Sequence, residues 1–143
     1  LERVEGSGYF VNVHDVFRPR PRSEGNTPLS AGDATGDVVT INTSVQVAIT
    51  GLKPNLVLDD GCFIEFRMTG NRKCVSRVDG DVALDGFGAG TVNLREAINT
   101  SIFDNTATVN VEKPSVIMKL TSPTLPRAWG ERRASFSAVE RQF

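Results

Sequence analysis

The segment DVVTINTSVQVAIT, residues 37–50, gives the clearest indication of the fold class of this chain. When it is extended, most of its apolar residues share one side, namely Val39, Ile41, Val45, Val47 and Ile49, and polar residues such as Thr40, Asn42 and Gln46 share the other. This alternation with a period of two predicts a half-buried β-strand. Because the stretch is longer than the usual five or six residues of a strand, we expect it to bend at Thr43-Ser44 or to cross from one sheet to another.

The same alternation recurs in shorter segments. It predicts strands at about 8–17, 56–58, 62–68, 73–78, 82–84, 107–111, 116–120 and 134–138. One segment, at about 94–102, has helical spacing instead, with Asn93 as its N-cap and Glu96 as the capping-box partner. We therefore predict an all-β fold, an antiparallel β-sandwich or a jelly-roll or Ig-like barrel, with one short helix and extended arms.

Length and charge limit the classes of protein that the chain can represent. It has 143 residues and a formal net charge of -1, so we expect a single β-domain over residues 1–143. No apolar run approaches the roughly 20 residues that cross a bilayer, and no signal-peptide pattern follows Leu1. The 16 basic and 17 acidic residues are too balanced for a strong nucleic-acid field. We expect neither a membrane nor a nucleic-acid partner.

Two polar segments that contain Pro interrupt the predicted strands, at 18–37 and 121–133. The first, RPRPRSEGNTPLSAGDATGD, has one large apolar residue, which predicts a long irregular arm, and the second predicts an irregular loop. Because such an arm has few contacts of its own, we expect a neighbouring subunit to hold it. The candidate interface residues are Arg18, Arg20, Arg22, Leu29, Arg127, Trp129, Arg132 and Arg133.

Charge is unevenly distributed along the chain. Residues 25–121 carry 8 basic and 11 acidic groups, whereas residues 122–143 carry 4 basic and 2 acidic groups. This distribution favours contact between the Arg-rich arm or tail of one subunit and the acidic body of another. The alternatives are an exposed solubilising loop for the arm and a lid on the core for Trp129.

The chain lacks the side chains of most catalytic sites. His14 is the one histidine, and no G-x-S-x-G or comparable nucleophile elbow accompanies it. Cys62 and Cys74 do not match zinc spacing, and a hairpin of 62–68 with 73–78 separates them too far for a disulfide. The Gly-rich run at 86–90 departs from the G-x-G-x-x-G fingerprint. We expect no enzyme activity, no small-molecule substrate and no cofactor.

Three carboxylates, Asp79, Asp81 and Asp85, fall in one Gly-containing loop. Carboxylate oxygens are the ligands that Ca²⁺ prefers, but the EF-hand pattern with its bidentate Glu is absent. A DG turn followed by a solvated loop explains the same residues. We interpret the segment as a solvated loop, with a calcium site as the alternative.

Together these features predict a non-enzymatic structural protein. It is a β-sandwich subunit that packs through extended arms on copies of itself and on other proteins of a larger assembly. The most concrete version, by analogy of architecture, is a virion component of the capsid, decoration or tail type. The alternative is an extracellular or cell-surface recognition module that binds a glycan or protein through loops near 79–90 and Trp129. The first predicts self-association, and the second predicts a stable monomer with a soluble ligand.

Overall fold

The structure, a computed structural model, describes residues 2–4, 8–124 and 135–140. Every strand pair in these residues is antiparallel, which confirms the predicted β class. The helices are the 3-10 helix η1 (Arg22–Glu24) and the α-helix α1 (Ala31–Ala34). The strands are β1 (Glu2–Val4), β2 (Gly8–His14), β3 (Thr35–Thr43), β4 (Gln46–Thr50), β5 (Val57–Leu58), β6 (Phe63–Met68), β7 (Arg72–Arg77), β8 (Val82–Ala83), β9 (Gly90–Asn93), β10 (Thr108–Asn110), β11 (Ser115–Thr124) and β12 (Ser135–Glu140).

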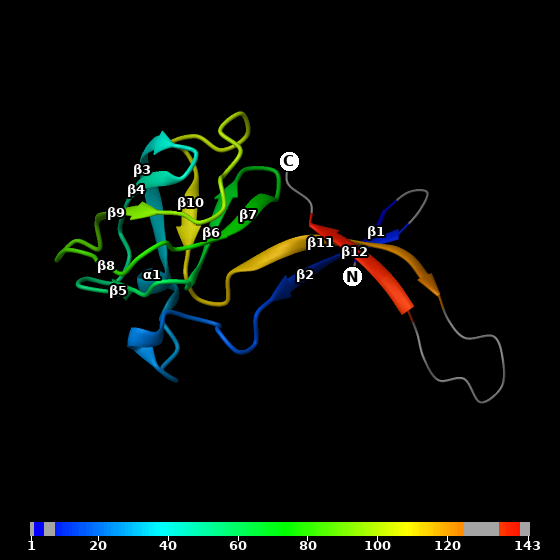
Figure 1. Cartoon of the computed structure of the whole chain (residues 1–143), viewed down its shortest axis with the longest axis horizontal. Coiled ribbons are helices and arrows are strands. Elements are labelled where there is room, and N and C mark those ends of the chain that lie inside the picture. The colour runs from blue at the N-terminus through cyan, green and yellow to red at the C-terminus, as the bar shows by residue number, and fades with distance from the viewer. Residues whose placement is uncertain (1, 5–7, 125–134, 141–143) are drawn as a thin grey trace.

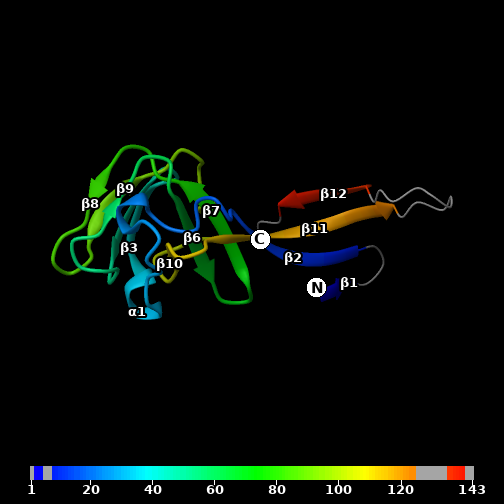
Figure 2. The same cartoon turned by 90° about the horizontal axis from the view of Figure 1, so that it is seen from below.

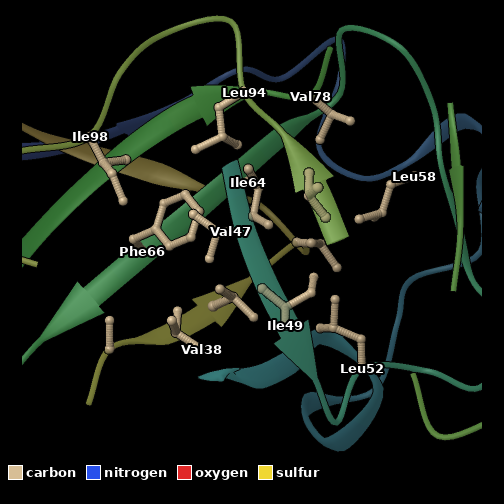
Figure 3. Packing of buried hydrophobic residues seen from close by; sticks show 14 of the residues in the cluster. Val38, Val47, Ile49, Leu52, Leu58, Ile64, Phe66, Val78, Leu94 and Ile98 are labelled. Atoms are coloured by element: carbon tan, nitrogen blue, oxygen red, sulfur yellow. The ribbon is translucent and has the colours of Figure 1, made fainter. Parts of the chain in front are cut away.

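Most of the described chain forms a body around a six-stranded sheet with the strand order β7-β6-β10-β3-β4-β9. The sheet curls around a hydrophobic core, and the β5–β8 pair lies to one side (Figure 1). In this core, Val47 and Ile49 of β4 pack with Ile64 and Phe66 of β6, and each is at most 1% exposed (Figure 3). Burial of such apolar side chains is the main stabilising contribution to the body.

A second sheet projects from the body and combines the two ends of the described chain. Its strand order is β1-β2-β11-β12, so strands near the start of the chain pair with strands near its end. Figures 1 and 2 show β2 and β11 running outward from the body side by side. We call this element the projecting sheet. Among the side chains that the structure describes, no member of the body's core belongs to β2 or β11.

The stretch at 37–50 forms a hairpin, so the predicted single bent strand is wrong. Strands β3 and β4 reverse at Ser44-Val45, and two register shifts interrupt their pairing. As a result Val38 is buried whereas Val39 is 51% exposed. A tight turn and β-bulges therefore preserve most of the apolar alternation in the sequence while changing the direction of the chain.

The predicted helix at 94–102 is also wrong. Leu94 and Ile98 are buried, but their backbone N–H groups donate at 2.8 Å to the carbonyl oxygens of Val45 and Ser44. The Glu96 carboxylate accepts hydrogen bonds from Arg77 and does not cap a helix. Tertiary hydrogen bonds therefore override the helical spacing of this segment.

The 18–37 segment is more regular than predicted, because it contains η1, α1 and the start of β3. Leu29 packs against the core. The Lys53 Nζ lies 2.7 Å from Glu24 Oε2, which fastens η1 to the body. Contacts within the chain thus hold part of the segment, and its contact with a neighbouring subunit stays a prediction.

Candidate functional site

Strands β2 and β11 place a run of apolar residues on one face of the projecting sheet. Cross-strand partners share a face of a sheet, and here the register pairs Val13 with Val116, Val11 with Met118 and Tyr9 with Leu120. The alternating positions on the opposite face are mixed, since they include Asn12 and His14, both exposed, and also the half-buried Ile117. We call the first set of positions the apolar face. Val13 is 42% exposed, so the chain itself covers this face only in part.

An apolar hollow lies where the projecting sheet meets the body. It has a volume of about 250 Å³ and is lined by Val13, Pro114 and Val116 at the root of the sheet, by Phe63 and Val75 of the body, and by His14 and Asp15. Since Val13 and Val116 belong to the apolar face, the hollow continues that face into the corner. Small-molecule pockets measure roughly 300–1,000 Å³, so the hollow lies just below that range and has room for a protein side chain.

Two exposed apolar residues follow Asp15, which lines the hollow after the end of β2. Val16 is 68% exposed and Phe17 is 91% exposed. The Phe17 N–H donates to Asp15 Oδ1 at 2.8 Å, so a local turn determines where the pair stands. Burial of a Phe side chain is worth roughly 2–3 kcal/mol, and Phe17 gains almost none of it within this chain. The pair is therefore apolar surface that this chain leaves exposed to water.

A buried carboxylate fastens the root of the projecting sheet to the body. Glu65 of β6 is 0% exposed. Its oxygens accept hydrogen bonds from Arg67 Nε at 2.5 Å, Asn110 Nδ2 at 3.2 Å and Ser115 N at 3.0 Å, the last at the start of β11. The Lys73 Nζ lies 3.6 Å from Glu65 and donates to Ser115 Oγ at 2.7 Å. These bonds connect the start of β11 to β6, β7 and β10 of the body.

Arg20 and Leu29, two of the predicted interface residues, are engaged within the chain. Arg20 donates to both oxygens of Glu112 at 2.9 and 2.8 Å, which holds the pKa of Glu112 below its usual value. Leu29 is half-buried, and its N–H donates to the same carboxylate. Arg18 and Arg22 are exposed, and an interface role for them remains a prediction.

The remaining interface residues, Arg127, Trp129, Arg132 and Arg133, lie outside the described residues. The loop predicted at 121–133 begins later than expected, because β11 extends through Thr124.

The three aspartates of the calcium alternative do not form one cluster. Asp85 Oδ1 accepts two N–H groups of its own loop, at 2.8 and 3.0 Å. Asp81 accepts a hydrogen bond from Asp60 N, and Asp79 lies 3.8 Å from Arg95 Nε. Within the described ranges, no group of three His, Cys, Asp or Glu residues is placed to hold a metal ion.

The Gly-rich run at 86–90 is explained by packing. Gly88 has a φ of +67°, and a Cβ at this position would lie 1.9 Å from the carbonyl oxygen of Leu52. Only glycine permits this conformation and this close approach of two backbone segments. The neighbouring Phe87 is 82% exposed.

Both cysteines, Cys62 and Cys74, are reduced and buried. The predicted hairpin that carries them is present as β6 and β7, with Cys74 opposite Phe66. Burial raises the pKa of the Cys62 thiol to about 12. This thiol is therefore protonated at neutral pH and unsuited to nucleophilic chemistry.

Sequence patterns identified the strands at 8–17 and 116–120 but not the apolar face that they form together. The signal that could have found it is the matched alternation in two segments about a hundred residues apart. No helix among the described residues is long and apolar enough to cross a membrane. No protein-family model matches the chain, and no curated protein or solved structure shows significant similarity to it.

Proposed function

We propose that this chain is a non-enzymatic structural subunit of a larger protein assembly and that the projecting sheet joins it to its neighbours. The observation that carries this proposal is the apolar face, which continues into the hollow between the projecting sheet and the body. Val13 on this face is 42% exposed. A partner that covers the face would remove this apolar surface from water, at about 25 cal/mol per Å².

The form of the projecting sheet also supports an assembly role. Both of its outer strands, β1 and β12, have one unpaired edge in the described residues. Open edges can pair with strands of another chain, and they give affinity through backbone hydrogen bonds. Glu65 and its partners fix the root of the sheet, so a neighbour would meet a preformed surface with little entropy to lose.

The most concrete version of this proposal is a virion component of the capsid, decoration or tail type, which rests on analogy of architecture. The curled six-stranded sheet with the β5–β8 pair beside it supports a body of the sandwich or barrel class. The partners would be copies of this chain and other proteins of the same assembly.

The test is the mass of the full chain in solution, measured by light scattering after size exclusion over a hundredfold range of concentration. We expect a defined oligomer. Met118→Lys places a charge on the apolar face and should dissociate it, whereas Asn12→Lys adds the same charge to the opposite face and should not. A wild-type chain that stays monomeric throughout contradicts the proposal.

A recognition module of an extracellular or cell-surface protein is the second candidate. Phe87 favours it, because it is 82% exposed beside a glycine whose packing fixes the loop. Rigid loops with an exposed aromatic side chain serve as binding platforms. This function predicts a monomer that binds a soluble glycan or protein and loses that binding in Phe87→Ala.

A further inference from the structure

We propose that the apolar hollow and the Val16–Phe17 pair are the two halves of one interface between two copies of this chain. This inference rests on the proposed function and specifies its partner. Phe17 of each copy occupies the hollow of the other copy, and the two apolar faces pack together beyond it.

The positions of the two halves favour a reciprocal contact. Asp15 lines the hollow and also accepts the N–H of Phe17, so the exposed pair begins at the rim of the hollow. Phe17 is 91% exposed and therefore does not fill the hollow of its own chain. A two-fold axis beside the end of β2 brings each Phe17 to the other hollow, because such an axis makes a surface meet its own copy.

The apolar lining of the hollow matches the aromatic side chain of Phe17. Five of its seven lining residues are apolar: Val13, Phe63, Val75, Pro114 and Val116. An aromatic side chain in such a pocket is a typical anchor of a protein interface. The exposed Phe17 supplies that anchor from the same chain, so no other protein is needed to complete the site.

The available area suits a weak, reversible dimer. An exposed Phe offers about 180 Å². Strands β2 and β11, about 4.8 Å apart and with about six paired residues each at 3.3 Å, give a face of about 190 Å². Two copies thus bury about 740 Å², which is in the range of weak, transient interfaces.

The experiment compares the dissociation constant of the full chain and three variants by analytical ultracentrifugation. Phe17→Ser removes the anchor, and Val75→Trp fills the hollow. Val39→Ser is the matched control, because Val39 is 51% exposed and belongs to β3 of the body. Since a dimer loses two anchors at once, we expect the first two variants to weaken association at least about 100-fold. The control should leave it unchanged.

The decisive measurement is the association of a mixture of Phe17→Ser with Val75→Trp. One partner retains its Phe17 and the other retains its hollow, so a mixed dimer regains one of the two contacts. We expect the mixture to associate more tightly than either variant alone. Equal association of the mixture and the separate variants would overturn the reciprocal arrangement.

Other outcomes separate this inference from the proposed function. If Met118→Lys dissociates the oligomer while Phe17→Ser does not, the inference fails and the assembly role stands. A monomeric wild-type chain overturns both. If Val75→Trp fails to fold, as shown by circular dichroism, the comparison of Phe17→Ser with Val39→Ser still decides the result.

Discussion

Replacement of Glu65 by Gln tests how the projecting sheet is held to the body. The substitution keeps the size of the side chain but removes its charge, and it puts an NH₂ group where one carboxylate oxygen accepted hydrogen bonds. Glu65 is fully buried, and its donors come from β6, β7, β10 and the start of β11. The variant therefore weakens the joint without creating a cavity.

The expected magnitude follows from which donors can recover. Loss of one partner of a buried ion pair costs about 3–5 kcal/mol. The Arg67 side chain is 47% exposed and can turn to water, whereas Lys73 is only 14% exposed and stays near the uncharged amide. We therefore expect the lower end of the range, about 3 kcal/mol, which corresponds to a fall of roughly 6–12 °C in Tm for a chain of this size.

The measurement is urea unfolding followed by circular dichroism, together with amide hydrogen exchange of Ser115. Its N–H donates to Glu65, so this amide should exchange faster in Glu65→Gln. Glu96→Gln is the matched control, since it breaks a pair whose side chains are 43% and 45% exposed. Such a surface pair contributes about 1 kcal/mol or less. Equal urea midpoints for the two variants, or an unchanged Ser115 amide, would refute the role of Glu65.

Three further predictions concern the body. Gly88→Ala should cost about 2–4 kcal/mol, because its Cβ would collide with Leu52 O, whereas Gly70→Ala, with φ +80° and open space, should cost about 1 kcal/mol; thermal melts that rank the two equally contradict this. The hydrogen bond from Arg20 lowers the pKa of Glu112 below its ordinary 4.5, so its contribution is present above pH 4.5 and is lost as the pH falls through the lower folded value. The urea midpoint should thus drop below pH 4.5, less steeply in Glu112→Gln, and parallel profiles of the two proteins would rule this out. Burial raises the pKa of Cys62 to about 12, so it should not react with a thiol reagent at pH 8 until urea unfolds the chain; fast labelling of the native protein at this residue would show otherwise.

Local patterns were sufficient for most strands of the body. The hairpin of β6 and β7 could be predicted because apolar alternation runs into a turn, where Gly70 and Asn71 adopt positive φ. Residues of these types tolerate that conformation, so the sequence itself marks the reversal. The hairpin of β3 and β4 lacks a Gly at its turn, and its direction was therefore missed.

The candidate site was less predictable than the fold. The Arg-rich composition of the 18–37 segment led to the prediction of an interface there. Arg20 of this segment instead pairs with Glu112 of its own chain. Residues that carry the proposed interface, such as Val13 and Phe17, have ordinary apolar side chains. Only the pairing of β2 with β11 shows that Val13 and Val116 lie together and that the body leaves them partly uncovered.

Composition and the order of neighbouring residues were enough to predict the β class of this protein, the absence of a disulfide between its two cysteines and the scarcity of catalytic side chains. The strand pairing, the irregular backbone of 94–102 and the projecting sheet formed by the two ends of the described chain follow from contacts between distant residues. Alternation specifies that one side of a strand is apolar but not what covers that side. Which part of the molecule covers the apolar side of a strand depends on contacts between distant residues, such as Glu65 with Ser115. These contacts exist only once the chain has folded.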